Sequence, residues 1–179
     1  MKIYFVRHSL RDNSVKEDVI APLTEEGHQK AELLIEFFRD KKIEMIFASP
    51  YKRVIETVSP IAENLKLPIK QIDGLRERKI GYWVEDFYDY AQQQWHDFDF
   101  KLENGESLNE VQNRIVQTYQ SIIKNSDYET LLIGGHGTAM SLLFNDLTKG
   151  KFNYNDFLQM KMPSIYMWDT ETEQLTHIQ

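Results

Sequence analysis

Short apolar runs alternate with longer amphipathic patterns along this chain, and this alternation constrains the fold more than any other feature. Five runs of four or five residues are rich in β-branched and aromatic residues, which is typical of buried strands. These expected strands are Ile3–Val6, Glu44–Ala48, Ile69–Ile72, Leu131–Gly134 and Ser164–Trp168. Helical patterns separate most of them, so we predict a three-layer α/β/α domain with a mostly parallel central sheet.

Four helices are expected between these strands. Their expected starting points are Thr24, Tyr51, Ser107 and Gly137. Ser107 is followed three residues later by Glu110, which is the spacing of a capping box. Pro60 lies inside the second helical pattern, and we expect either a kink there or a fresh helix start with Ser59 as its cap.

Composition limits the class of protein and its partners. With 179 residues and 41% hydrophobic content, residues 1–179 are expected to form a single domain. A net charge of −7 argues against nucleic acid as a partner. The chain has no cysteine, no signal-peptide pattern and no apolar stretch near the ~20 residues of a membrane span. We expect a soluble, cytoplasmic protein without a membrane partner, either a monomer or a homodimer.

The segment Tyr82–Phe100 differs from the rest of the chain. It is dense in aromatic and acidic residues and contains no lysine or arginine. We interpret residues of about 82–105 as an excursion that lies over or beside the functional site as a lid. A helix that packs on the core through its aromatic residues explains the same pattern equally well.

Two of the expected strands are each followed by a histidine. Ile3–Val6 is followed by Arg7 and His8, and Leu131–Gly134 is followed by a glycine and His136. Ligand sites of open α/β sheets lie at the carboxyl ends of the strands. We therefore expect both histidines at one edge of the sheet.

An anion fits this edge better than a metal ion does. Arg53 follows a third strand, and the planar guanidinium groups of Arg7 and Arg53 match the oxygens of a phosphate. Arginine beside His8 would repel a cation, so we expect no metal site. Glu77, which follows the strand Ile69–Ile72, is the candidate proton donor.

Taken together, these motifs resemble the histidine phosphatase superfamily. The motifs, in their order along the chain, are Arg7-His8, LTEEGHQKA, SPYKR, LRE, NGES and GHG. The resemblance spans nearly the whole chain and implies a Rossmann-like, phosphoglycerate mutase-like fold with no cofactor. It implies that His8 is the nucleophile, that Arg7, Arg53 and a charged His136 hold the phosphate, and that Glu77 donates the proton.

The chain departs from the family pattern at one notable position. The family usually has Gly after the first His, whereas this chain has Ser9, which either narrows the pocket or adds a hydroxyl to the phosphate. The usual Asn after the nucleophile has no clear match, and Asn13 or Arg11 are the nearest alternatives. The expected substrate-binding residues are Ser9, Arg11, Asn13, Gly137 and Arg76.

The expected function is metal-independent hydrolysis of a phosphomonoester, a small phosphorylated metabolite, through a phosphohistidine. Phosphoglycerate mutase-type phosphoryl transfer is an alternative, although the segment after Glu77 lacks the added basic residues that a mutase needs for its second anionic group. A non-catalytic module that binds a phosphorylated ligand is a second alternative. The presence of His8, Glu77 and His136 argues against it.

Overall fold

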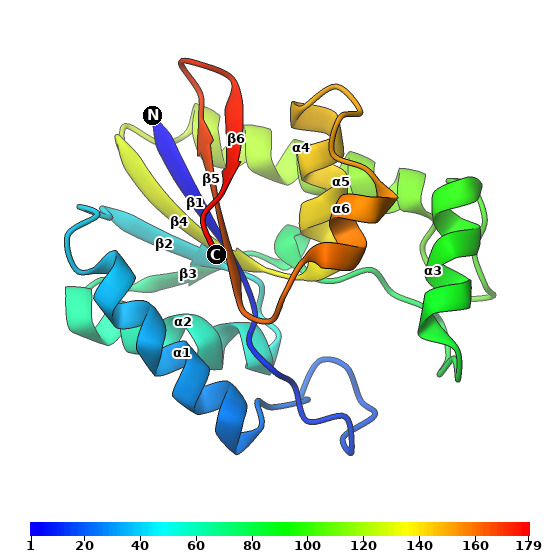
Figure 1. Ribbon diagram of the computed structural model, residues 1–179. Coiled ribbons are helices and arrows are strands. Elements are labelled where there is room, and N and C mark those ends of the chain that lie inside the picture. The colour runs from blue at the N-terminus through cyan, green and yellow to red at the C-terminus, as the bar shows by residue number, and fades with distance from the viewer.

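The computed structural model describes residues 1–179, which form one six-stranded sheet between layers of helices (Figure 1). The strands are β1 (Lys2–Arg7), β2 (Met45–Ala48), β3 (Ile69–Gln71), β4 (Thr130–Gly135), β5 (Ser164–Asp169) and β6 (Gln174–His177). The helices are α1 (Glu25–Phe38), α2 (Lys52–Leu65), α3 (Phe87–His96), α4 (Leu108–Lys124), α5 (Gly137–Leu147) and α6 (Tyr154–Gln159), with a short 3₁₀ turn, η1 (Asp73–Leu75). The predicted α/β class and mostly parallel sheet are confirmed.

The strand order is β3-β2-β4-β1-β5-β6. β3, β2, β4 and β1 are parallel neighbours, and β5 pairs antiparallel with both β1 and β6. In the pairing of β1 with β4, Arg7 lies opposite Gly135, so the chain leaves both strands at the same edge. This register places His8 and His136 in adjacent positions at the carboxyl end of the sheet.

The two faces of the sheet carry separate apolar cores. Along β1, Ile3 and Phe5 pack in the cluster that includes α4 and α5, whereas Tyr4 and Val6 pack with α1 and α2. Successive side chains of a strand point to opposite faces, so a strand that is covered on both sides reads as a continuous apolar run. Figure 1 shows α1 and α2 on one face and α4 and α5 on the other.

The predicted helix starts are confirmed at the caps. Thr24 Oγ1 accepts a hydrogen bond from the Gly27 amide, and Ser107 forms the capping box with Glu110. The fresh start expected at Ser59 is wrong, because α2 continues through Pro60 as one helix. Val58 and Ile61 are buried on either side of Pro60, so packing on the sheet holds the helix together despite one missing N–H donor.

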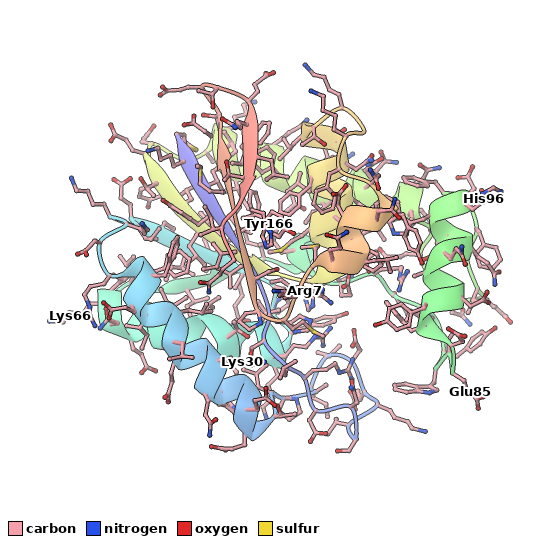
Figure 2. The ribbon with its side chains drawn as sticks, in the orientation of Figure 1. Arg7, Lys30, Lys66, Glu85, His96 and Tyr166 are labelled. Atoms are coloured by element: carbon pink, nitrogen blue, oxygen red, sulfur yellow. The ribbon has the colours of Figure 1, made fainter.

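The segment after Glu77 forms α3 at the side of the molecule. Trp95 of α3 stacks on Phe157 of α6 at a ring distance of 5.9 Å, while Tyr88 and Trp83 are exposed. Figure 2 labels Glu85 and His96 near the two ends of α3, well away from Arg7 at the end of β1. Packing through aromatic residues therefore anchors α3, and closure of this segment over the site stays a prediction.

No helix of the chain combines the length and the apolar character that crossing a membrane requires.

Candidate active site

The carboxyl ends of the parallel strands bring the predicted catalytic residues together. Arg7 ends β1 and His8 follows it, and the amide of His8 donates to Gly135 O at 3.0 Å. His136 follows β4 and caps α5. The rings of His8 and His136 lie 5.3 Å apart between centroids, as the strand register requires.

His8 is held in one tautomer by its own neighbour. Its Nδ1 lies 2.7 Å from the carbonyl oxygen of Ser9, which only accepts hydrogen bonds, so Nδ1 carries the proton and donates. Nε2 is then unprotonated and carries a free lone pair. Burial, together with the positive charges of Arg53 and Arg7, holds the pKa of His8 well below its ordinary value. The neutral imidazole with a free Nε2 is the nucleophilic form.

His136 is neutral when no phosphate is bound. Arg53 Nη2 lies 3.1 Å from His136 Nδ1, and because a guanidinium only donates, Nδ1 accepts. Nε2 therefore carries the proton and donates to Ser49 Oγ at 2.8 Å. Burial and the charge of Arg53 hold the pKa of His136 well below its ordinary value. The expectation of a charged His136 concerns the site with phosphate bound, and it stays a prediction.

Arg53 is buried and Arg7 is partly buried beside the histidines. Arg53 is 2% exposed, and Arg7 Nη1 donates to Met160 O from the segment before β5. Burial lowers the pKa of Arg7, and the charge of Glu77 partly offsets this effect. Both guanidinium groups keep a buried Nε without a hydrogen-bond partner.

Glu77 lies at the amino end of α5, next to His136. Its Oε2 accepts from Thr138 N at 3.1 Å, and its Oε1 accepts from Ala139 N at 3.0 Å and from Arg78 N at 2.8 Å. Two of these amides belong to the first turn of α5 and fix the position of the Glu77 carboxyl group. The predicted proton donor is thus brought to the same edge as the histidines.

The predicted substrate-binding residues have diverse surroundings. Ser9 is fully buried; its amide donates to Thr57 Oγ1 at 2.9 Å, and its Oγ has no partner. Gly137 packs directly against the Arg7 guanidinium. Asn13 is exposed in the loop between β1 and α1. Their contacts with a substrate stay predictions.

The other two predicted substrate-binding residues are engaged in ion pairs. Arg11 pairs with Asp18 at 2.6 Å, and Arg76 pairs with Glu106 at 2.9 Å and with Asp73 at 3.4 Å. Their roles with substrate likewise stay predictions.

Three site residues were missed by sequence reasoning. The Asp18 carboxylate accepts a hydrogen bond from Arg53, and Ser49 Oγ accepts one from His136. Arg114 donates to the backbone carbonyl of Glu77. Ser49 directly follows a predicted strand, and this position was an available signal. Asp18 and Arg114 had none, because their partners are distant in sequence.

Comparison with known proteins identifies the family. Residues 3–177 match the sequence model of the histidine phosphatase superfamily (branch 1). The putative phosphoserine phosphatase 2 of Hydrogenobacter thermophilus is 28% identical over 82% of this chain and 78% of its own. The uncharacterized phosphatase PhoE of Bacillus subtilis is 27% identical over 83% and 78% of the two chains.

Solved structures share the fold over nearly the full length. A mycobacterial glucosyl-3-phosphoglycerate phosphatase superposes with a TM-score of 0.82 at 18% identity, covering 99% of this chain and 96% of the other. YhfR from Bacillus stearothermophilus gives a TM-score of 0.79 at 24% identity, covering 98% and 94%. The family match spans nearly the whole sequence and agrees with the order of the strand-end residues. The chain belongs to the histidine phosphatase superfamily, branch 1.

Proposed function

We propose that this protein is a metal-independent phosphatase that hydrolyses a phosphomonoester through a phosphohistidine on His8, with Glu77 as the proton donor. The tautomer of His8 carries the proposal. Its Nδ1 is occupied by Ser9 O at 2.7 Å, so Nε2 is unprotonated and available beside Arg7 and Arg53. A nucleophile that is already deprotonated needs no separate general base.

In the first step, His8 Nε2 bonds to phosphorus and the bond from phosphorus to the ester oxygen breaks. The departing oxygen takes a proton from the Glu77 carboxyl. In the second step, a water oxygen bonds to phosphorus and gives a proton to the Glu77 carboxylate, and the bond from Nε2 to phosphorus breaks. His8 and Glu77 return to their starting states, and inorganic phosphate is released.

The cationic groups supply the stabilisation that phosphoryl transfer needs. The transferring group carries its charge on three equatorial oxygens, and catalysis rests on positioning and charge neutralisation. Arg53 is buried and Arg7 is partly buried at this edge, and the positive charges of both act on His8. An arriving phosphate dianion also favours the charged form of His136, because an opposite charge nearby stabilises the protonated ring.

The named relatives support a phosphoric monoester hydrolase that acts on a small phosphorylated metabolite. One is named a putative phosphoserine phosphatase, and one structural neighbour is a glucosyl-3-phosphoglycerate phosphatase. A binding module without turnover is disfavoured, because His8 and Glu77 both lie at the edge of the sheet that carries the two arginines. Mutase-type transfer is disfavoured because Arg76 is already paired with Glu106 and Asp73.

The proposal is tested by hydrolysis of p-nitrophenyl phosphate in excess EDTA, with His8→Ala and Glu77→Gln beside the wild type. His28→Ala is the matched control, because His28 is a partly exposed histidine near Glu56, on α1. We expect turnover in the wild type and in the control, and none in His8→Ala. Enzyme quenched in alkali during turnover should carry a phosphoryl group that is stable in alkali and is released by acid. Activity that EDTA abolishes, or that survives His8→Ala, would contradict the mechanism.

Glu77→Gln separates the proton donor from the nucleophile. An alkyl phosphate has a poor leaving group and requires protonation, whereas p-nitrophenolate leaves largely without it. We expect Glu77→Gln to lower the turnover of an alkyl phosphate about 100-fold or more, and that of p-nitrophenyl phosphate much less. Equal losses for the two esters would argue against Glu77 as the acid.

A further inference from the structure

In the ligand-free protein, the guanidinium of Arg53 already contacts a carboxylate of the same chain, that of Asp18. Arg53 Nη1 donates to the carbonyl oxygen of Asp18, and Nη2 lies 3.2 Å from Oδ1 and 3.3 Å from Oδ2 of the same residue. Nη2 also contacts His136 Nδ1 at 3.1 Å. Asp18 therefore occupies the guanidinium edge that faces His136, which is where a substrate phosphate would bind.

A second arginine holds the same carboxylate more closely. Arg11 Nη1 lies 2.6 Å from Asp18 Oδ1, and Arg11 Nη2 donates to Val15 O at 2.8 Å within the same loop. The carboxylate is thus shared between a short contact with Arg11 and a longer one with Arg53. If a phosphate takes Arg53, Asp18 keeps its charged partner. The exchange leaves no unpaired carboxylate, which makes displacement inexpensive.

The side chain of Asp18 can move while the backbone of its loop stays in place. Asp18 is 40% exposed at its side chain, and its neighbours Val19 and Ile20 are about half exposed. Figure 1 shows this loop, between β1 and α1, outside the layered body of the fold at the carboxyl end of β1. The loop backbone is tied to α2, because Val19 O accepts a hydrogen bond from Lys52 N at 3.0 Å, so the exchange between Arg11 and Arg53 involves only the Asp18 side chain.

We propose that Asp18 is an internal competitor of the phosphate group for Arg53, and that Arg11 alone holds the Asp18 carboxylate when phosphate binds. This inference rests on the proposed function, because it assumes that Arg53 binds the substrate phosphate. Each bound phosphate must displace a carboxylate of like charge from the same guanidinium. Asp18 therefore weakens the binding of substrate and of product phosphate alike, and it speeds release of the product.

The same contacts have a different consequence if Asp18 only orients Arg53. In that case removal of the carboxylate would leave the Arg53 side chain disordered, and phosphate would bind more weakly. The two roles therefore predict opposite signs for one measurable quantity, the dissociation constant of inorganic phosphate.

The test is calorimetric titration of the full-length protein with inorganic phosphate at fixed ionic strength, which requires no turnover. We expect Asp18→Asn to lower the dissociation constant about fivefold, the upper range for one partly exposed ion pair. We expect Arg11→Met to raise it by a similar factor, because Asp18 then has only Arg53 as a partner. The double variant should behave like Asp18→Asn, since Arg11 acts only through Asp18.

Asp12→Asn is the matched control, because Asp12 lies in the same loop and its carboxylate accepts from Ser14 N at 2.9 Å. It should leave the dissociation constant of phosphate unchanged. A weaker or unchanged affinity in Asp18→Asn would overturn the proposal. A double variant that binds more weakly than Asp18→Asn would also overturn it, because Arg11 would then hold phosphate directly. If the proposed function fails instead, wild-type hydrolysis is absent while these phosphate affinities still report on Asp18.

Discussion

The guanidinium of Arg7 occupies the space that a side chain at Gly137 would need. A Cβ atom at residue 137 would lie 2.9 Å from Arg7 Cζ and 3.0 Å from its Nε, and Arg7 is further held by Met160 O. Glycine at the start of α5 thus lets the Arg7 guanidinium pack against the backbone that follows His136.

We expect Gly137→Ala to displace Arg7 and to lower kcat/KM for p-nitrophenyl phosphate on the order of 100-fold, the effect of an ångström-scale shift in a positioning group. The end of the Arg7 side chain can move, so the fold should survive, and thermal unfolding should change little. The check is a double-mutant cycle with Arg7→Ala. In that background Gly137→Ala should have almost no further effect, and a full second loss would show that the alanine acts elsewhere.

Stability should fall in mild acid because of the two buried histidines. The pKa values of His8 and His136 are lowered well below 6.5 in the folded protein, so the unfolded chain binds more protons once the pH falls below about 6.5. The free energy of unfolding is therefore fully present above that pH and decreases below it. Each histidine contributes a slope of up to about 1.4 kcal/mol per pH unit.

Urea unfolding at pH 7.5, 6.5 and 5.5 measures this slope. His136→Gln should flatten the decrease between pH 6.5 and 5.5 by the contribution of one histidine, whereas His96→Gln, at an exposed position on α3, should leave it unchanged. Saturating phosphate favours the charged form of His136 and should also reduce the decrease. A decrease identical in the wild type and in His136→Gln would contradict the burial of a neutral ring.

The parts of the fold that sequence predicts best are those that carry their own signal. β1 and β4 are buried on both faces, so their apolar runs are continuous, and the polar residues that end them mark the site. β6 was missed because Gln174–His177 is a short, partly exposed edge strand in which Leu175 is the only apolar residue. α6 was missed because six residues are too few to show a helical period.

The parts of the site that sequence does not predict depend on long-range contacts. Asp18 and Arg53 are 35 residues apart, and the path of an irregular loop decides whether they meet. Arg114 occupies a polar position on a predicted helix, where a solvated role is the usual one, yet its partners lie 38 and 40 residues earlier. Neither loop path nor the aim of a long polar side chain leaves a periodic pattern.

Arg114 supports the segment that carries Glu77. Its Nη1 donates to Gly74 O and Arg76 O at 2.9 Å each, its Nη2 contacts Glu77 O at 3.4 Å, and its Nε pairs with Glu106 at 3.0 Å. We expect Arg114→Met to lower the free energy of unfolding by about 3 kcal/mol, because it leaves Glu106 with less compensation and three carbonyls without a donor.

If Arg114→Met displaces Glu77, the loss of turnover should also differ between phosphate esters. Turnover of an alkyl phosphate should fall more than that of p-nitrophenyl phosphate in Arg114→Met, because only the alkyl leaving group depends on the acid. Arg39→Met is the control, since Arg39 forms an exposed pair with Glu36 on α1 and should change neither stability nor the ratio. A ratio that stays at its wild-type value would limit Arg114 to a structural role.

Gln94 links α3 to the body of the protein. It is fully buried; its Nε2 donates to Phe100 O at 2.9 Å and to Glu106 O at 3.0 Å, and its Oε1 accepts from Arg78. The substitution Gln94→Leu removes both donors and leaves the buried Arg78 guanidinium without its acceptor. We expect the free energy of unfolding to fall by about 3 kcal/mol, measured by urea denaturation.

Gln93→Leu is the matched control, because Gln93 is the adjacent, exposed residue of α3 and bonds only to Asp89. It should change stability by less than about 0.5 kcal/mol. Amide hydrogen exchange should locate the effect of Gln94→Leu, with faster exchange over residues 87–96 than over β1 and β4. The buried amide joins a surface helix to the segment just before α4, so the helix should loosen before the sheet does. Uniformly faster exchange throughout the chain would instead show that Gln94 stabilises the whole domain and that α3 does not open separately.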